Sequence, residues 1–259
     1  MLIDGVLAVE ASALTASLSL AEQAAIRAVL VSHPHFDHCK DLPGLAYNGP
    51  WEQPIEVVGS AGTHAVLRRT LFDPSLWLPF FDFPPAAPRL AYREARAHEP
   101  LTVAGYRVVP VPSDHYAPAE LPVLTGQAAP TRDPSVALGF FIACGDASLY
   151  YTGDTGPGFA AALGDLRPDV LVTEVGLPNA QRHRVSELRH LTPADLQAEL
   201  EILGARGGPA QGAPARVLAV HLAPHSEAAI RAELVEVARA TGAAIEVATE
   251  GQRLTVTAP

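Results

Sequence analysis

Three histidines and one aspartate lie within the segment His33-Pro34-His35-Phe36-Asp37-His38, which follows the apolar run AVLVS. Imidazole and carboxylate groups are ligands for borderline and hard divalent cations. Ligands that alternate along an extended turn can converge on one centre, and Pro34 stiffens this turn and disfavours helix at His33. Because a single ion would leave some of these ligands over, the spacing indicates a site for two ions.

Further side chains of the same kinds follow other apolar runs that have the composition of strands. Those runs end at His115 (YRVVPVPSDH), Asp154 (SLYYTGD), Glu174 (DVLVTE) and His221 (ARVLAVH). A lone histidine after a strand is usually a surface residue or one with satisfied hydrogen bonds. With the run before His33, however, there are five such coincidences, which makes that explanation improbable for all of them. In open α/β sheets the carboxyl edge of the strands is the usual place for a site. We therefore expect these residues to gather at one such edge.

The elements that must position these residues are short strands alternating with helices. Short runs rich in β-branched and aromatic residues predict the strands, from AVLVS through AAIEVAT to RLTVT at 253–257. Ser19 and Glu22 predict a capping box, and a helical pattern after Ser226 ends at Gly242. In LTPADLQAEL, Thr192 is the expected N-cap, with Pro193 at the first helical position and Asp195 two positions later.

We expect one α/β domain over residues 1–259, built from two similar halves. The segments 71–90 and 118–135 are rich in proline and turn residues, so they are predicted to be irregular connections.

Composition narrows the choice of partner and compartment. The 259 residues carry a formal net charge of −10, which argues against binding long nucleic acid through a basic face. A bound metal can still reverse the local field for a small anionic substrate. The two cysteines make no disulfide framework, no apolar run reaches membrane-spanning length, and the N-terminus does not read as a signal peptide. We therefore expect a cytoplasmic protein with no membrane partner.

The H-x-H-x-D-H signature, with the later histidine, the T-G-D turn and the final histidine, resembles the metallo-β-lactamase superfamily. The resemblance implies a four-layer αββα sandwich, here expected to lack its first strands because the sequence begins almost at LIDG. It also implies a dinuclear metal site. One ion would be bound by His33, His35 and His115, the other by Asp37, His38 and His221, and Asp154 would bridge the two.

A second resemblance concerns the segment TEVGLPNAQRHRVSELRHLTPADLQAEL, residues 173–200, which is similar to class II cyclic-nucleotide phosphodiesterases. In that family E-x-x-x-P-N and H-L-T-P segments recur in this order. The related tRNA 3′-processing nucleases carry a comparable Glu and His pair, proposed to protonate the leaving group. On this basis Glu174 and His190 are expected to be catalytic residues. Asp37, which the superfamily resemblance makes a metal ligand, is the third expected catalytic residue.

The predicted function is hydrolysis of 3′,5′-cyclic nucleotides such as cyclic AMP and cyclic GMP. Two divalent ions would lower the pKa of a shared water and so present hydroxide near neutral pH. Zinc is favoured by the histidine-rich ligand set, with manganese or iron as alternatives. The alternative functions are another hydrolysis on the same fold, by an RNA-processing nuclease, lactonase, thioesterase or β-lactamase, or a metal-bound module without turnover. Whether the chain forms a homodimer is left open.

Several other side chains have simpler structural explanations. Cys39 is expected to be a small buried packing residue, although it follows a predicted ligand. Trp77 and Phe80 suit packing better than stacking on a nucleobase. The basic group formed by Arg182, His183 and Arg184 is expected to be a solvated loop, although an anionic substrate could contact it.

Overall fold

The computed structural model describes residues 1–115, 137–205 and 214–256, and its chain divides into two compact units. The first unit comprises Met1–Gly105 and Tyr116–Leu138, and the second comprises Tyr106–His115 and Gly139–Pro259. Each unit is described by itself. The expectation of a single domain over residues 1–259 stays a prediction, as does the cytoplasmic location. Within the described residues, no helix is both long enough and apolar enough to span a membrane.

The first unit contains a five-stranded sheet in the order β1-β2-β3-β4-β5. Its strands are β1 (Leu2–Ile3), β2 (Leu7–Val9), β3 (Ala28–Leu30), β4 (Ile55–Gly59) and β5 (Leu90–Glu94). Strands β2 to β5 run parallel, and β1 pairs with β2 in the antiparallel direction. The short strand β6 (Leu101–Val103) ends this part of the chain.

The helices of the first unit are α1 (Leu14–Ser17), α2 (Leu20–Ala25), α3 (Phe36–Cys39), α4 (Leu42–Asn48) and α5 (Ala61–Arg69). Their apolar faces pack on the sheet in one continuous core, in which Leu42 and Leu45 of α4 and Val29 and Val57 of the strands are fully or almost fully buried. The predicted capping box is confirmed at the start of α2, where the Glu22 amide donates to Ser19 Oγ and the Ser19 amide donates to the Glu22 carboxylate.

The second unit contains strands ordered β12-β11-β10-β9-β8-β7. Their bounds are β7 (Tyr106–Pro112), β8 (Leu138–Cys144), β9 (Ala147–Tyr151), β10 (Val170–Glu174), β11 (Arg216–Val220) and β12 (Ile245–Val247). Strands β9 to β12 are parallel neighbours, whereas β8 and β9 form an antiparallel hairpin.

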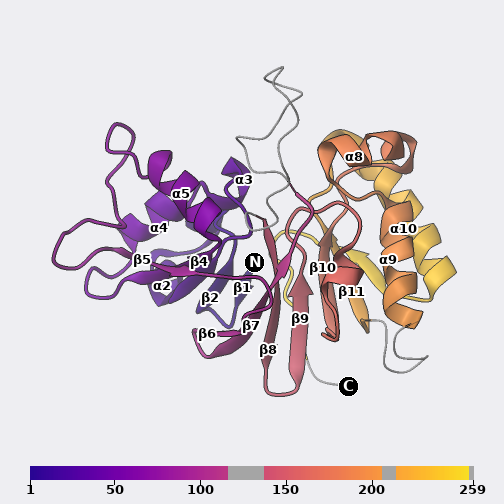
Figure 1. The fold of residues 1–259 in the computed structure, drawn as a ribbon, viewed down its shortest axis with the longest axis horizontal. Coiled ribbons are helices and arrows are strands. Elements are labelled where there is room, and N and C mark those ends of the chain that lie inside the picture. Colours follow the sequence, from indigo (N-terminus) through magenta and orange to yellow (C-terminus); the bar gives the residue numbers. More distant parts are fainter. Residues whose placement is uncertain (116–136, 206–213, 257–259) are drawn as a thin grey trace. The chain divides into compact units, whose positions relative to one another are not determined.

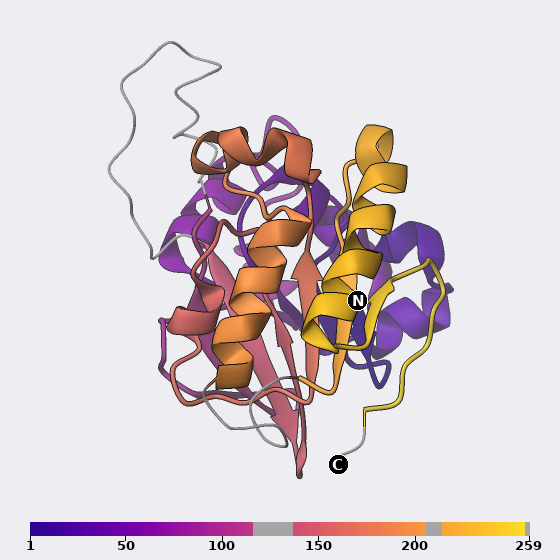
Figure 2. The same ribbon diagram turned by 90° about the vertical axis from the view of Figure 1, so that its right-hand side faces the viewer.

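The helical segments of the second unit are α7 (Phe159–Ala162), η2 (Asn179–Arg184), α8 (Val185–Leu188), α9 (Pro193–Ala205), η3 (Pro224–Ser226) and α10 (Glu227–Thr241). Figure 2 shows α9 and α10 side by side across one face of the sheet. They bury Leu196, Leu200, Ile230 and Leu234 in a core of their own.

The start of α9 confirms its predicted cap. The Asp195 amide donates to Thr192 Oγ1 at 3.3 Å, and the Asp195 carboxylate accepts from the Thr192 amide at 3.2 Å. Leu191 and Leu196 are both fully buried, as the predicted packing across this turn requires.

These observations confirm the predicted α/β fold class, with two sheets and packed helices. Two local expectations are wrong. No strand forms over the described part of the predicted run RLTVT, because residues 253–256 pair with no strand in the described structure. The histidine-rich segment is not an extended turn throughout, since α3 begins at Phe36. Residues 71–89 are irregular as predicted, Leu90 begins β5, and 118–135 lies outside the described residues.

Candidate active site

Three parallel strands of the second unit bring predicted site residues to the same edge of its sheet. Glu174 is the last residue of β10, His221 directly follows β11, and Asp154 follows β9 by three residues. Strand β10 pairs in parallel with both neighbours, so the carboxyl ends of all three strands face the same side. The sequence expectation of a common edge therefore holds for these residues.

The Asp154 carboxylate lies between two imidazoles. Its Oδ2 atom is 3.9 Å from Nε2 of His115 and 3.5 Å from Nε2 of His221, and only 3% of the Asp154 side chain is exposed. The distance to His115 is too long for a hydrogen bond. Two ligands that each lie about 2.0–2.2 Å from one ion are at most about 4.4 Å apart. Both separations therefore fit atoms that bind a shared divalent ion, and one oxygen faces both histidines.

The orientation of His115 is fixed by a main-chain carbonyl. Its Nδ1 atom lies 3.0 Å from the carbonyl oxygen of Arg189. A carbonyl oxygen can only accept a hydrogen bond, so Nδ1 must carry the hydrogen. Neutral His115 therefore presents the lone pair of Nε2 toward Asp154, which is the form that can bind a metal ion.

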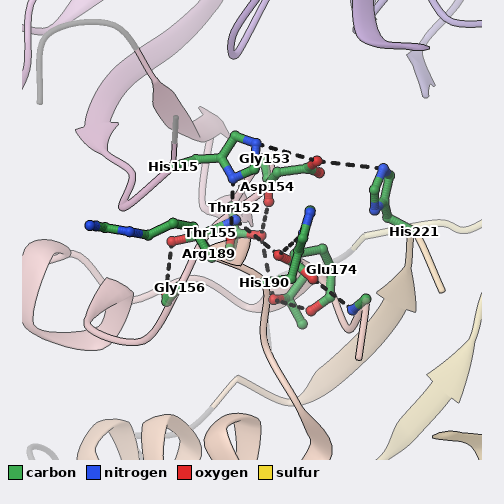
Figure 3. A network of polar contacts seen from close by, with 12 residues as sticks. His115, Thr152, Gly153, Asp154, Thr155, Gly156, Glu174, Arg189, His190 and His221 are labelled. Carbon is green, nitrogen blue, oxygen red and sulfur yellow. Dashed lines mark hydrogen bonds and ion pairs between the residues drawn. The ribbon is translucent and has the colours of Figure 1, made fainter. Parts of the chain in front are cut away.

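Glu174 and His190 form a buried pair beside this carboxylate. Nδ1 of His190 is 2.9 Å from Oε1 of Glu174, and the Glu174 side chain is 1% exposed. The backbone amides of Thr155 and Gly176 also donate to the Glu174 carboxylate, at 3.0 and 2.7 Å. In Figure 3 the His190 ring extends away from Glu174 and toward the Asp154 carboxylate.

The electrostatics of this pair favour a proton on the imidazole. Burial lowers the pKa of His190, but the hydrogen bond and negative charge of Glu174 outweigh burial and raise that pKa above its ordinary value. Burial also raises the pKa of the Glu174 carboxyl, and the hydrogen bond and charge of His190 oppose that shift. We infer that the carboxylate, with its three donors, supports the imidazolium form of His190.

His190 also lies close enough to its neighbours to be considered as a ligand. Asp154, His190 and His221 each offer an atom that lies within 4.8 Å of the others. The hydrogen bond from Nδ1 to Glu174 leaves Nε2 as the atom directed to this space. That nitrogen can either bind an ion or hold a proton, and these two roles make different predictions for a His190 variant.

In the first unit, three predicted ligands cluster through their rings. The ring centroid of His33 is 4.4 Å from that of His35 and 4.2 Å from that of His38. His33 and His38 are buried, whereas the side chain of Asp37 is 60% exposed and its Oδ2 lies 3.5 Å from Nε2 of His38. Four predicted ligands thus belong to the first unit, and His115, Asp154 and His221 belong to the second.

Glu10 is a site residue that the sequence interpretation missed. Its Oε1 atom lies 3.4 Å from Nδ1 of His38, and its carboxylate accepts from the amide of Ser32 at 3.3 Å. Glu10 is 5% exposed and has a φ of 64°, a left-handed conformation that is uncommon outside glycine. The sequence contained the signal, because Glu10 directly follows the apolar run Leu7–Val9, as the other candidate residues follow theirs.

A cavity of about 280 Å³ adjoins the imidazoles of the second unit. Its wall combines His190 and His221, whose rings stack at 5.6 Å between centroids, with the apolar residues Leu177, Leu222 and Pro224. No charged carboxylate or guanidinium lines it among the described residues. The cavity therefore offers an uncharged surface next to the candidate proton donor.

Two of the remaining sequence candidates, Cys39 and Phe80, are packing residues as predicted. Cys39 is 1% exposed and Phe80 is fully buried, whereas Trp77 is partly exposed. Burial raises the pKa of the Cys39 thiol to about 12, so it is a packing residue rather than a thiolate ligand. Arg182 is held by an ion pair with Asp195 at 2.9 Å.

The sequence of residues 1–249 matches the family described as the beta-lactamase superfamily domain. The chain belongs to this family. No protein of curated function matches the sequence. Together with the histidine and aspartate groups, the family indicates a metal-dependent hydrolase in general terms.

Solved structures with the same fold share little sequence with the chain. The metallo-beta-lactamase fold protein YhfI from Bacillus subtilis has a TM-score of 0.67 and 15% identity, over 95% of this chain and 85% of that one. Unliganded yeast PDE1 has a TM-score of 0.68 and 16% identity, over 90% of this chain and 69% of that one. The short form of human tRNase Z has a TM-score of 0.61 and 14% identity, over 98% of this chain and 90% of that one. At these identities the likeness shows the fold alone.

Proposed function

We propose that the protein is a metal-dependent phosphodiesterase that hydrolyses 3′,5′-cyclic nucleotides. The observation that carries the proposal is the Glu174–His190 pair, in which the buried carboxylate raises the pKa of an imidazole that lies close to Asp154 and His221. An activated ester can be opened without a proton donor because its leaving group is good. The ribose oxygen of a cyclic nucleotide is a poor leaving group and needs a proton as the P–O bond breaks.

The proposed metal assignment is the one that the sequence resemblance implies. His33, His35 and His115 would bind one ion, Asp37, His38 and His221 the other, and Asp154 would bridge them. Within the second unit, the position of Asp154 Oδ2 between Nε2 of His115 and Nε2 of His221 supports a bridging role. Zinc suits the imidazole-rich donor set best, with manganese or iron as alternatives. When bound, the ions would activate a water and neutralise charge on the phosphoryl oxygens.

The chain's own residues would supply the remaining chemistry. His190 would donate the Nε2 proton to the leaving oxygen, and Glu174 would hold the ring through Nδ1 and stabilise its positive charge. Since the donor must contact the leaving oxygen, the leaving side of the substrate would lie at the His190 wall of the cavity. Asp37 would serve as a ligand and hold its ion at the reacting phosphorus.

Cavity size and charge support a small substrate. A volume of about 280 Å³ lies at the lower end of ligand pockets, which are usually about 300–1,000 Å³. The uncharged wall of Leu177, Leu222 and Pro224 suits a nucleoside better than a further phosphate group. The net charge of −10 disfavours a long polyanion such as RNA.

A substrate panel on zinc-loaded and manganese-loaded protein tests the proposal. The panel contains cyclic AMP, cyclic GMP, bis(p-nitrophenyl) phosphate, a lactone and nitrocefin. We expect the cyclic nucleotides and the activated diester to be hydrolysed, and the lactone and nitrocefin to be hydrolysed poorly or not at all. Faster turnover of nitrocefin or the lactone than of every diester would overturn the proposal. Hydrolysis of the activated diester alone would leave phosphodiester chemistry standing and remove cyclic nucleotides as the substrate.

A further inference from the structure

Two pairs of consecutive residues in the second unit contact each other through both main chain and side chain. One pair is Asp114-His115, which follows β7, and the other is Arg189-His190, which follows α8. The Arg189 carbonyl oxygen accepts from Nδ1 of His115 at 3.0 Å. The Arg189 guanidinium, through Nη1, forms an ion pair with the Asp114 carboxylate. Each pair therefore offers one charged side chain to the contact. Each also offers one imidazole to the candidate site, and Figure 3 shows these two rings, His115 and His190, with Arg189.

The backbone of Arg189 has the conformation that directs its carbonyl to His115. Arg189 ends α8 with φ 55° and ψ 47°, in the left-handed region that favours glycine, and its amide donates to the Val185 carbonyl at 2.8 Å. A residue with a side chain is strained in this conformation. An arginine in place of glycine therefore indicates that its side chain contributes something that glycine would not. Within the described contacts, that contribution is the ion pair with Asp114.

Asp114 is hydrogen-bonded to the turn that carries Asp154. The Gly156 amide donates to the Asp114 carbonyl at 2.8 Å, and the Asp114 amide donates to Thr155 Oγ1 at 3.3 Å. A Cβ atom at Gly156 would lie only 2.9 Å from Oδ2 of Asp114. Asp114 thus packs directly against the residues that follow Asp154, and Arg189 binds to this packed unit.

We propose that Arg189 is a positioning residue that serves two imidazoles at once. Its carbonyl sets the tautomer and the ring orientation of His115. Its side chain binds Asp114 and so holds in place both this carbonyl and the backbone that leads into His190. The role toward His115 concerns a metal ligand and stands without any particular reaction. The role toward His190 rests on the proposed phosphodiesterase function.

The anchor should depend on a guanidinium and a carboxylate. Arg189 is only 13% exposed and Asp114 is 38% exposed at the side chain, so the pair is partly shielded from water. A guanidinium stays charged and holds its planar donors in a fixed geometry, whereas the flexible ammonium of lysine fixes direction less well. We therefore expect Arg189→Lys to keep part of the anchoring to Asp114 and Arg189→Gly to keep none of it.

The test compares Arg189→Gly, Arg189→Lys and Asp114→Asn with the matched control Arg184→Ala. Glycine keeps the carbonyl and adopts the left-handed conformation without strain, so this variant removes only the anchor. Arg184 lies in the same helical region, is 42% exposed at its side chain, and pairs with Glu187 rather than with the site. A thermal melt of each variant checks that the fold is kept.

Two measurements without substrate come first. The ¹⁵N chemical shifts of the His115 ring in metal-free protein should report the Nδ1–H tautomer in wild type and a mixture of tautomers in Arg189→Gly. Zinc affinity, measured by competition with a chelator, should fall by roughly 10–100-fold in Arg189→Gly and Asp114→Asn, the usual effect of losing a group that orients a metal ligand. The two substitutions together should cost little more than either alone, because both break the same contact.

Activity comes last and separates the two proposals. With saturating zinc, Arg189→Gly should lower kcat more than it raises KM, because the donor is misplaced rather than the binding surface lost. An unchanged tautomer and unchanged zinc affinity in Arg189→Gly would overturn the positioning role. A fall in zinc affinity in a protein that hydrolyses none of the diesters would refute the proposed function and leave the role of Arg189 toward His115 intact.

Discussion

Nδ1 of His190 lies 2.9 Å from Oε1 of Glu174, whose side chain is almost completely buried. Two backbone amides, those of Thr155 and Gly176, hold the rest of the carboxylate. The carboxylate therefore cannot turn to follow the imidazole, and the imidazole takes its direction from the carboxylate. This fixed orientation is what the proposed role of His190 as proton donor requires.

Replacing His190 by alanine should reduce hydrolysis of cyclic nucleotides by roughly 10²–10⁴-fold, the usual range for general acid catalysis. Bis(p-nitrophenyl) phosphate should lose less activity, because its leaving group needs little protonation. Metal content, measured by elemental analysis, should stay near normal. His183→Ala serves as the control, since His183 lies on the exposed side of η2.

The same variant decides the role of His190. Equal losses on both substrates would mean that His190 binds the phosphate. Loss of metal would place it among the ligands, as its closeness to Asp154 and His221 allows.

The raised pKa of His190 predicts the alkaline side of the pH profile. Because the His190 pKa is raised, its protonated form persists to higher pH, and kcat/KM should fall only above that raised value. Glu174→Gln removes the negative charge that raises the pKa. The fall should then occur at lower pH in Glu174→Gln than in wild type.

The measurement is a pH series of kcat/KM on cyclic AMP at saturating metal, with Glu187→Gln on the surface of α8 as the control. An alkaline limb that stays in place, or moves to higher pH, would show that Glu174 does not stabilise the protonated ring.

Replacing Asp154 by alanine should impair metal binding more than replacing His221. One oxygen of Asp154 faces both His115 and His221, whereas His221 would lose contact with a single ion. We expect elemental analysis of zinc-reconstituted wild type to give two ions per chain, and of Asp154→Ala to give fewer than one. Asp146→Ala, at the exposed turn between β8 and β9, controls for the loss of a carboxylate. Equal metal content in wild type and Asp154→Ala would contradict the bridging role.

Arg89 makes a prediction for the stability of the first unit. Its fully buried guanidinium donates to the carbonyl of Ala46 at 2.8 Å and of Gly49 at 2.7 Å, and also to that of Pro50. Methionine would keep much of the volume but leave these carbonyls without their donor. We expect Arg89→Met to lower the free energy of unfolding by about 3 kcal/mol, since each buried group without a partner costs roughly 1–3 kcal/mol.

Urea denaturation compares Arg89→Met with Arg69→Met, in which an exposed arginine of α5 is replaced. A loss below about 1 kcal/mol in Arg89→Met, equal to that of the control, would show that water replaces the guanidinium without cost.

The features that local sequence could predict are those fixed by neighbouring residues. The capping boxes at Ser19 and Thr192 were predicted because each uses two side chains three positions apart. The edge that collects Asp154, Glu174 and His221 was predicted because parallel strands place their carboxyl ends together.

The features that sequence could not predict depend on which distant segments meet. The run RLTVT has the composition of a strand, but a strand needs a partner, and β-propensity does not specify one. The hydrogen bond from His115 to the Arg189 carbonyl joins residues 74 positions apart, and a main-chain acceptor leaves no trace in residue type. Glu10 was missed for a different reason, since the apolar run before it was not among the runs predicted as strands, although it forms β2.

Gly176 carries no functional group, yet the space beneath the His190 ring leaves little room for a side chain at this position. A Cβ atom there would lie 3.2 Å from Cβ and Cγ of His190 and 3.2 Å from Oε2 of Glu174, closer than such contacts normally are. In a saturation library at position 176, selection for folding and selection for turnover should therefore diverge. Many substitutions would survive the first selection, and almost none beyond glycine and alanine the second. Gly176, which has no functional group, would then tolerate as few substitutions as a catalytic residue. The segment Glu-Val-Gly at 174–176 would be retained as a whole.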